Sequence, residues 1–194
     1  AFGGGAVGRD AGVRVVFVAG GAPGDRVVAR IVDDKRSFVR AELVRVVAAG
    51  AGRVPAPCPI VDRCGGCPWQ HVALDAQLAA KQAIVARALA KSGARVEPII
   101  PSPAALGYRA RARMTARGGA IGFAGRRSHE IVDVERCLAL EPALDLAMQA
   151  ARRALGAVVG EEATLAGLVQ DGAVELAVAS GRGADRARLA ERAR

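Results

Sequence analysis

The spacing of four cysteines constrains the fold of this 194-residue chain more than any other feature. Cys58, Cys64 and Cys67 fall within the ten residues CPIVDRCGGC, whereas Cys137 is separated from Cys67 by 69 intervening residues. The two glycines between Cys64 and Cys67 allow a tight turn, so both flanking thiolates can face one centre. A site that uses all four thiols therefore requires a fold that returns Cys137 to the other three.

Four cysteine ligands suit either a 4Fe–4S cluster or a structural zinc ion. The chain opens with no secretory signal, which argues against a disulfide framework. Four-cysteine zinc sites usually consist of two close pairs, whereas the arrangement here is three plus one. The CxxC pair lacks the βαβ context of a thioredoxin-type redox motif. The spacing favours an iron–sulfur cluster over zinc and leaves redox chemistry or plain buried thiols open.

The first part of the chain predicts a small antiparallel β-barrel of OB-like type. Three apolar, β-branched runs separated by turns read as strands, at residues 13–18, 26–32 and 38–47. Several short strands with tight turns are typical of such barrels. Residues 48–57 are rich in Ala, Gly and Pro and read as a linker. We therefore expect a first domain at residues 1–55.

The remainder predicts a central α+β domain at residues 56–185, followed by the start of a linker at 186–194. Apolar periodicity and turn residues give two helices, two hairpins and one short strand: a helix at 75–92, a hairpin at 108–128 across Gly118-Gly119, a short strand at 130–134, a helix at 142–156 and a hairpin at 165–179 over Asp171-Gly172. The first helix is expected to pack through Leu74, Leu78, Val85 and Leu89. The second has the apolar stripe Leu144, Met148, Ala151 and Leu155.

Positive charge is concentrated in the first two-thirds of the chain. The net charge is +9, and residues 108–129 contain no Asp or Glu. Alternation along a strand places Arg109, Arg111 and Arg113 on one face, where an RNA backbone would neutralise their repulsion. The other candidate RNA contacts are Arg126 and Arg127 beyond the hairpin, Arg9 at a glycine-rich turn, and Lys35 and Arg36 at a hairpin tip. The alternative is a solvated basic face.

No uninterrupted apolar run reaches the length of a membrane span. With no membrane segment and no signal sequence, we expect a soluble, cytoplasmic and monomeric protein.

The cysteine segment resembles that of the iron–sulfur branch of the RNA uracil-C5 methyltransferases. The matching residues are Cys58, Cys64, Cys67, Gln70, His71, Ala76, Gln77, Leu78 and Lys81, and later Ser128, His129 and Cys137 in SHEIVDVERCLAL. The opening residues resemble the TRAM module that precedes the cysteine segment in that family. The resemblance implies a 4Fe–4S cluster held by the four cysteines. It also implies methylation of C5 of a uracil in RNA, with 23S ribosomal RNA favoured and S-adenosylmethionine as methyl donor.

Two departures from the family pattern accompany the resemblance. The first strand of the TRAM module is missing, and no residue matches the Rossmann-like domain that binds S-adenosylmethionine. We therefore expect no catalytic residue here, no Rossmann-like domain and no methyl transfer by the 194 residues alone. The rivals are a non-catalytic RNA-binding module stabilised by iron–sulfur or zinc, and a radical S-adenosylmethionine methylthiotransferase. The CxxxCxxC motif of the latter does not match the five-residue spacing between Cys58 and Cys64.

Overall fold

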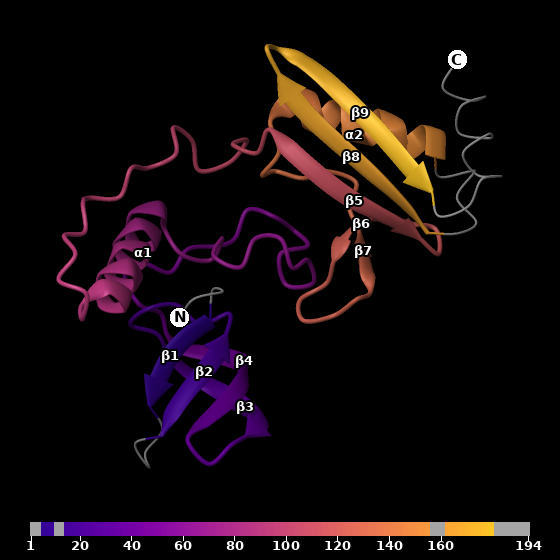
Figure 1. Ribbon diagram of the computed structural model, residues 1–194. Helices are drawn as coiled ribbons and strands as arrows, with labels where there is room; N and C mark the ends of the chain where they lie inside the picture. Colours follow the sequence, from indigo (N-terminus) through magenta and orange to yellow (C-terminus); the bar gives the residue numbers. More distant parts are fainter. Residues whose placement is uncertain (1–4, 10–13, 156–161, 181–194) are drawn as a thin grey trace. The chain divides into compact units, whose positions relative to one another are not determined.

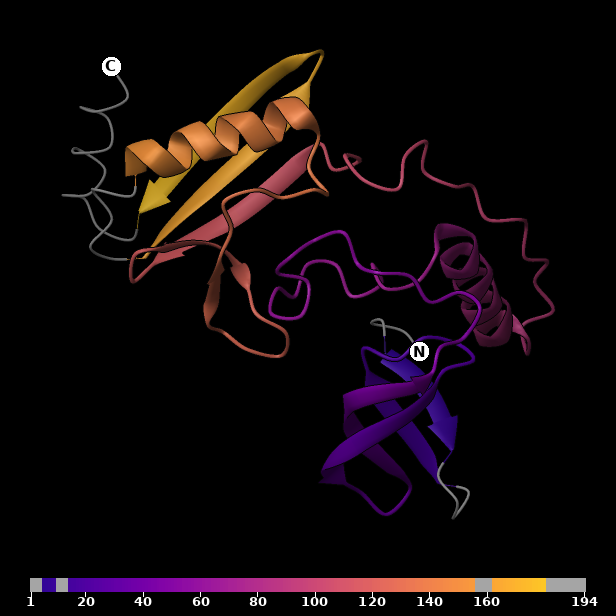
Figure 2. The same ribbon diagram turned by 180° about the vertical axis from the view of Figure 1, so that it is seen from behind.

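The computed structural model describes residues 5–9, 14–155 and 162–180 (Figures 1 and 2). The chain divides into two compact units, each built from two stretches of sequence. The first unit comprises residues 1–59 and 68–101, and the second comprises 60–67 and 102–194. The predicted linker at 186–194 lies outside the described residues.

The first unit contains a four-stranded sheet with the order β1-β2-β4-β3. Its strands are β1 (Gly5–Arg9), β2 (Val15–Ala19), β3 (Arg26–Asp34) and β4 (Phe38–Ala48). β1 was not among the predicted strands, because its glycines and small side chains give no β-branched run. The small core of this sheet includes Val39 and Ala41 of β4, which are 0% and 1% exposed.

The prediction of an antiparallel barrel is wrong. β4 pairs antiparallel with β3 but parallel with β2, so the sheet is mixed. The turn between β3 and β4 makes those strands antiparallel neighbours, and β4 then lies between β3 and β2. A parallel pair requires a crossover rather than a tight turn, and here β3 itself is part of that crossover. The apolar runs in the sequence predict strands, but they carry no information about strand direction.

The helix α1 (Leu74–Leu89) belongs to the first unit and has no fully buried residue. Its side chains Ala80, Ile84 and Ala88 line a cavity of about 700 Å³, together with residues of β1 and β2. Three of the four side chains predicted to form its packing face are exposed: Leu74, Val85 and Leu89. The helix therefore turns Ala80, Ile84 and Ala88 toward the cavity, which is a different face from the one that apolar periodicity predicted.

The second unit contains a five-stranded sheet with the order β7-β6-β5-β8-β9. Its elements are β5 (Arg111–Arg117), β6 (Ala120–Ala124), β7 (Ile131–Asp133), α2 (Pro142–Leu155), β8 (Ala163–Gln170) and β9 (Ala173–Ser180). All pairings among these strands are antiparallel. Both predicted hairpin turns are confirmed, since their central residues have positive φ angles: Gly118, Gly119, Asp171 and Gly172.

α2 packs across one face of this sheet, in front of it in Figure 2 and behind it in Figure 1. Leu144 and Met148 of α2 are buried against Met114 of β5 and Leu165 of β8. This confirms the predicted apolar stripe of the helix. Because side chains alternate along β5, Arg111 and Arg113 project from the opposite face of the sheet, which is turned toward the viewer in Figure 1.

Candidate metal centre and nucleic-acid interface

The turn that carries Cys64 and Cys67 is attached to the end of β6. The backbone of Cys64 forms an isolated antiparallel β-bridge with that of Gly125. The N–H of Gly65 donates a hydrogen bond to the carbonyl of Ala124 at 3.1 Å. A side chain at Gly65 would meet that carbonyl, so this position requires glycine. The N–H of Gly66 lies 3.4 Å from the sulfur of Cys64, a contact typical of thiolate ligands. The backbone thus shapes the turn around the sulfur.

Cys137 lies in the turn that leads into α2. Its N–H donates to the carboxylate of Asp145, at 2.8 Å, and Asp145 itself is buried in the first turn of α2. Burial raises the pKa of the Cys137 thiol, against the opposing effect of the N–H groups of Ala139 and Leu140. The thiol of Cys67 raises that pKa further, so these two sulfurs are electrostatic neighbours.

The second unit contains three of the four predicted ligands, Cys64, Cys67 and Cys137. None of the four cysteines forms a disulfide, and Cys64 is buried. Within the described residues, no group of three or more His, Cys, Asp or Glu side chains is arranged to hold a metal ion. A zinc ion requires its sulfurs to converge to about 2.3 Å from one point. Soft thiolate donors and a backbone N–H directed at sulfur fit an iron–sulfur cluster in chemistry.

Cys58 belongs to the first unit, where the side chain of Gln70 accepts a hydrogen bond from its N–H at 3.1 Å. The neighbouring His71 pairs through Nε2 with the carbonyl of Gly21 at 3.1 Å. Gln77 donates to the carbonyls of Trp69 and Val72 at 3.2 and 2.8 Å. The polar side chains of Gln70, His71 and Gln77 thus stabilise the conformation of the segment that precedes α1.

Arg109 does not lie on β5, which begins at Arg111. Its guanidinium donates to the carbonyl of Gly66 at 2.9 Å and lies against the ring of Tyr108 at 5.8 Å. Burial lowers the pKa of Arg109, but Tyr108 and the thiols of Cys67 and Cys137 outweigh it, so the pKa is raised. The predicted row of three arginines on one strand face therefore reduces to two.

Arg111 and Arg113 project from the face of the sheet opposite α2. They line a groove of about 420 Å³ with small and apolar neighbours on β8 and β9 and one acidic residue, Glu175. Neither arginine forms an ion pair or a side-chain hydrogen bond with any residue that the structure describes. We call Arg111, Arg113 and this groove the basic face.

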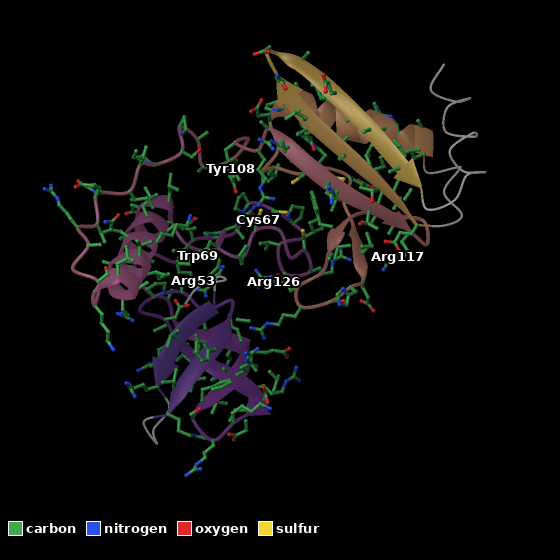
Figure 3. All side chains as sticks on the ribbon, viewed as in Figure 1. Arg53, Cys67, Trp69, Tyr108, Arg117 and Arg126 are labelled. Atoms are coloured by element: carbon green, nitrogen blue, oxygen red, sulfur yellow. The ribbon has the colours of Figure 1, made fainter. Side chains whose placement is uncertain are left out.

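The other basic candidates differ in whether their charged groups form ion pairs or are exposed. Arg117, at the far end of β5 from Tyr108 in Figure 3, pairs with Glu162 at 2.7 Å. Lys35 pairs with Asp33 at 3.0 Å, whereas Arg36 is exposed at the turn between β3 and β4. The backbone N–H of Arg126 donates to the carbonyl of Arg63, and its side-chain Nε is buried without a partner in the described part. Arg127 is exposed with φ +52°, and Arg9 ends β1.

An ion pair in the first unit was missed by the sequence reasoning. Arg53, labelled in Figure 3, pairs with Asp25 at 2.7 Å, and the Asp25 side chain is only 2% exposed. Burial opposes ionisation of Asp25, but hydrogen bonds from Arg53, Gly50 and Ala22 outweigh it and lower its pKa to about 2. The two residues are 28 positions apart, and neither stands in a pattern that points to the other.

Residues 2–44 match the family model of the TRAM domain. An RNA methyltransferase of Bdellovibrio bacteriovorus is 38% identical over 148 residues, which are 74% of this chain and 37% of that protein. The 23S rRNA (uracil(1939)-C(5))-methyltransferase of Acidithiobacillus ferrooxidans is 40% identical over 152 residues, 74% of this chain and 34% of that protein. The chain is a homologue of the RNA uracil-C5 methyltransferases. It spans about a third of the length of these relatives.

A solved structure supports the homology at the level of fold. The Pyrococcus abyssi tRNA (uracil-54, C5)-methyltransferase superposes with a TM-score of 0.62 at 21% identity, over 97% of this chain and 49% of that one. The predicted fold class, defined in part by an absent Rossmann-like domain, is overturned by this match. The match covers nearly the whole of this chain, so the two proteins share their fold over that length. No helix in the described part of the chain is long and apolar enough to cross a membrane.

Proposed function

We propose that this methyltransferase homologue binds RNA through its TRAM domain and the basic face, in an enzyme that methylates C5 of a uracil. The observation that carries the proposal is the pair Arg111 and Arg113, which form no ion pair with any acidic side chain that the structure describes, although Glu175 lines the same groove. Phosphate oxygens provide the charge-assisted hydrogen bonds that such guanidinium groups require. The names of the relatives favour 23S ribosomal RNA as the substrate.

The remaining basic candidates extend this proposal beyond the basic face. Arg36 is exposed at a hairpin tip of the TRAM domain, and Arg127 is exposed beyond β6. We assign them to phosphate contact together with Arg9, Lys35 and Arg126. Arg109 is left out of this set, because its guanidinium is occupied by the carbonyl of Gly66.

We further propose that Cys58, Cys64, Cys67 and Cys137 hold a 4Fe–4S cluster. Three features support it: the absence of a disulfide at the four cysteines, the N–H of Gly66 directed at the Cys64 sulfur, and the electrostatic interaction between Cys67 and Cys137. A bound cluster would supply a cross-link between segments far apart in sequence and so stabilise the second unit. With the thiols used in this way, none of the four is free to attack C6 of uracil, and S-adenosylmethionine serves the enzyme as methyl donor.

The RNA proposal is tested by the salt dependence of binding. Replacing Arg111 and Arg113 with Gln should weaken RNA binding, because two phosphate contacts are lost. The slope of log affinity against log salt should flatten by about 1.4 to 1.8, depending on whether the RNA is single- or double-stranded. Titrations over a range of salt concentrations measure this directly.

Arg117→Gln is the matched control, since it removes one positive charge from the same strand. Arg117 is already paired with Glu162, so its loss should change the slope little. A double variant whose slope equals that of the unaltered protein would contradict a role for the basic face in RNA binding.

The cluster proposal is tested by analysis of protein purified without oxygen. We expect equal amounts of iron and acid-labile sulfide, and a loss of both when any one of the four cysteines is replaced by Ser. A stoichiometric zinc content with no sulfide would refute the iron–sulfur assignment and favour the zinc alternative.

A further inference from the structure

Arg109 connects two segments of the second unit that lie far apart in the sequence. Its backbone joins the turn after Cys137: its N–H donates to the carbonyl of Ala139 at 2.9 Å, and its carbonyl accepts from the N–H of Glu141 at 3.0 Å. A parallel bridge with Leu140 is the result. The backbone of Arg109 is therefore fixed to the segment that carries Cys137.

The side chain of Arg109 reaches the other cysteine segment. Its guanidinium donates to the carbonyl of Gly66 at 2.9 Å, between Cys64 and Cys67. Its other terminal nitrogen would lie 3.9 Å from a Cβ placed on Gly66, so the guanidinium is in contact range of this turn. One residue thus ties both cysteine-bearing turns of this unit together.

The charge of Arg109 also interacts with the thiols, after a larger interaction with Tyr108. Its guanidinium interacts electrostatically with Cys67 and with Cys137, and it is half-buried. In the described ranges, no Asp or Glu forms an ion pair with it. A positive charge that is partly shielded from water and has no carboxylate partner is available to offset negative charge on the sulfurs.

We propose that Arg109 is a positioning residue for the cysteine site: it holds the Cys64–Cys67 turn against the Cys137 turn and offsets the charge of the bound thiolate cluster. This role rests on the proposed 4Fe–4S assignment. Hydrogen bonds and charges beyond the ligands are known to set both the affinity and the reduction potential of such sites. It also explains why Arg109 differs from Arg111 and Arg113, which line the groove beside β8 and β9 instead.

The test compares Arg109→Gln and Arg109→Lys with Arg111→Gln in the full chain, purified and reconstituted without oxygen. Arg109→Gln should lower iron and sulfide content per chain and shift the midpoint potential to a more negative value. Arg109→Lys keeps the charge but loses the planar guanidinium group. Its midpoint potential should therefore be close to that of the unaltered protein, whereas its iron and sulfide content should stay lower. Arg111→Gln should match the unaltered protein in both. A normal iron content and potential in Arg109→Gln would overturn the proposal.

A second readout needs no metal and separates this proposal from the cluster assignment. In the metal-free protein, dibromobimane should cross-link Cys67 to Cys137, as mapped by mass spectrometry. Arg109→Gln should lower the rate of this cross-link by about tenfold, the equivalent of one charge-assisted hydrogen bond. Equal rates in Arg109→Gln and Arg111→Gln would overturn the positioning role. If the unaltered protein takes up no iron or sulfide but its cross-link still depends on Arg109, only the cluster assignment fails.

Discussion

Asp25 illustrates how a single buried residue organises the first unit. Its carboxylate accepts hydrogen bonds from the N–H groups of Ala22 and Gly50 at 2.7 and 2.9 Å, and from Arg53. Arg53 also donates to the carbonyl of Gly20 at 2.6 Å. One ion pair therefore fixes the loop after β2 and the segment after β4, which explains why both partners are so little exposed.

Asp25→Asn should destabilise the first unit by about 3 kcal/mol, because it leaves the Arg53 guanidinium buried without its counter-charge. The pKa of about 2 in the folded protein lies below that of an unfolded aspartate. A lowered pKa means that the contribution is complete at neutral pH, about 2.5 kcal/mol, and is lost as the pH falls from about 4 to about 2. Denaturant titrations at several pH values measure both effects.

Asp34→Asn is the matched control for this prediction. Asp34 pairs with Arg14 at 2.8 Å, but its side chain is 55% exposed. An exposed pair contributes less than about 1 kcal/mol, so this variant should be close to neutral at every pH. If both variants lost the same stability, the importance of the Asp25 network would be refuted.

At the scale of elements, the pairing of β6 with β7 depends on the absence of a side chain at Gly122. This residue lies opposite Asp133 in the register of the two strands. A Cβ at Gly122 would overlap the carbonyl oxygen of Val132 and crowd the side chain of Val134. The backbone of β7 therefore approaches β6 at this point more closely than any other residue type allows.

Gly122→Ala should destabilise the second unit by about 2 to 3 kcal/mol, because β7 must move away from β6. Thermal denaturation followed by circular dichroism measures the loss. Gly8→Ala provides the control, since no heavy atom lies within 4 Å of a Cβ built at Gly8 in β1. An unchanged midpoint for Gly122→Ala would show that the strands adjust without cost.

At the scale of the whole molecule, we predict that the 194-residue chain binds RNA but transfers no methyl group by itself. Methylation of uracil C5 needs a nucleophile on C6 and a base for the C5 proton. The four thiols are assigned to the cluster, and the His71 ring is paired with Gly21. Incorporation of labelled methyl groups from S-adenosylmethionine into RNA measures this.

The Acidithiobacillus ferrooxidans relative serves as the positive control in the same assay. Transfer of label by these residues alone would contradict the prediction and, with it, the assignment of all four thiols to a cluster.

The local features of this protein could be predicted from the sequence. The positive-φ turns at Gly118-Gly119 and Asp171-Gly172 and the buried stripe of α2 depend on residues within a few positions of one another. Periodicity and turn chemistry therefore suffice to place them. The motif around Cys58, Cys64 and Cys67 is also local, and it was sufficient to indicate the methyltransferase family. The 4Fe–4S cluster itself stays a prediction.

Only the tertiary structure decided which segments meet. The parallel pairing of β2 with β4, the packing face of α1, the Asp25–Arg53 pair and the bond from Arg109 to Gly66 all join positions far apart in the chain. An apolar run in the sequence does not indicate whether the strand paired with it runs parallel or antiparallel. An alternating pattern of arginines does not indicate the residue at which the strand begins. Such contacts are set by the competition among all possible packings of the chain, which no short window of sequence contains.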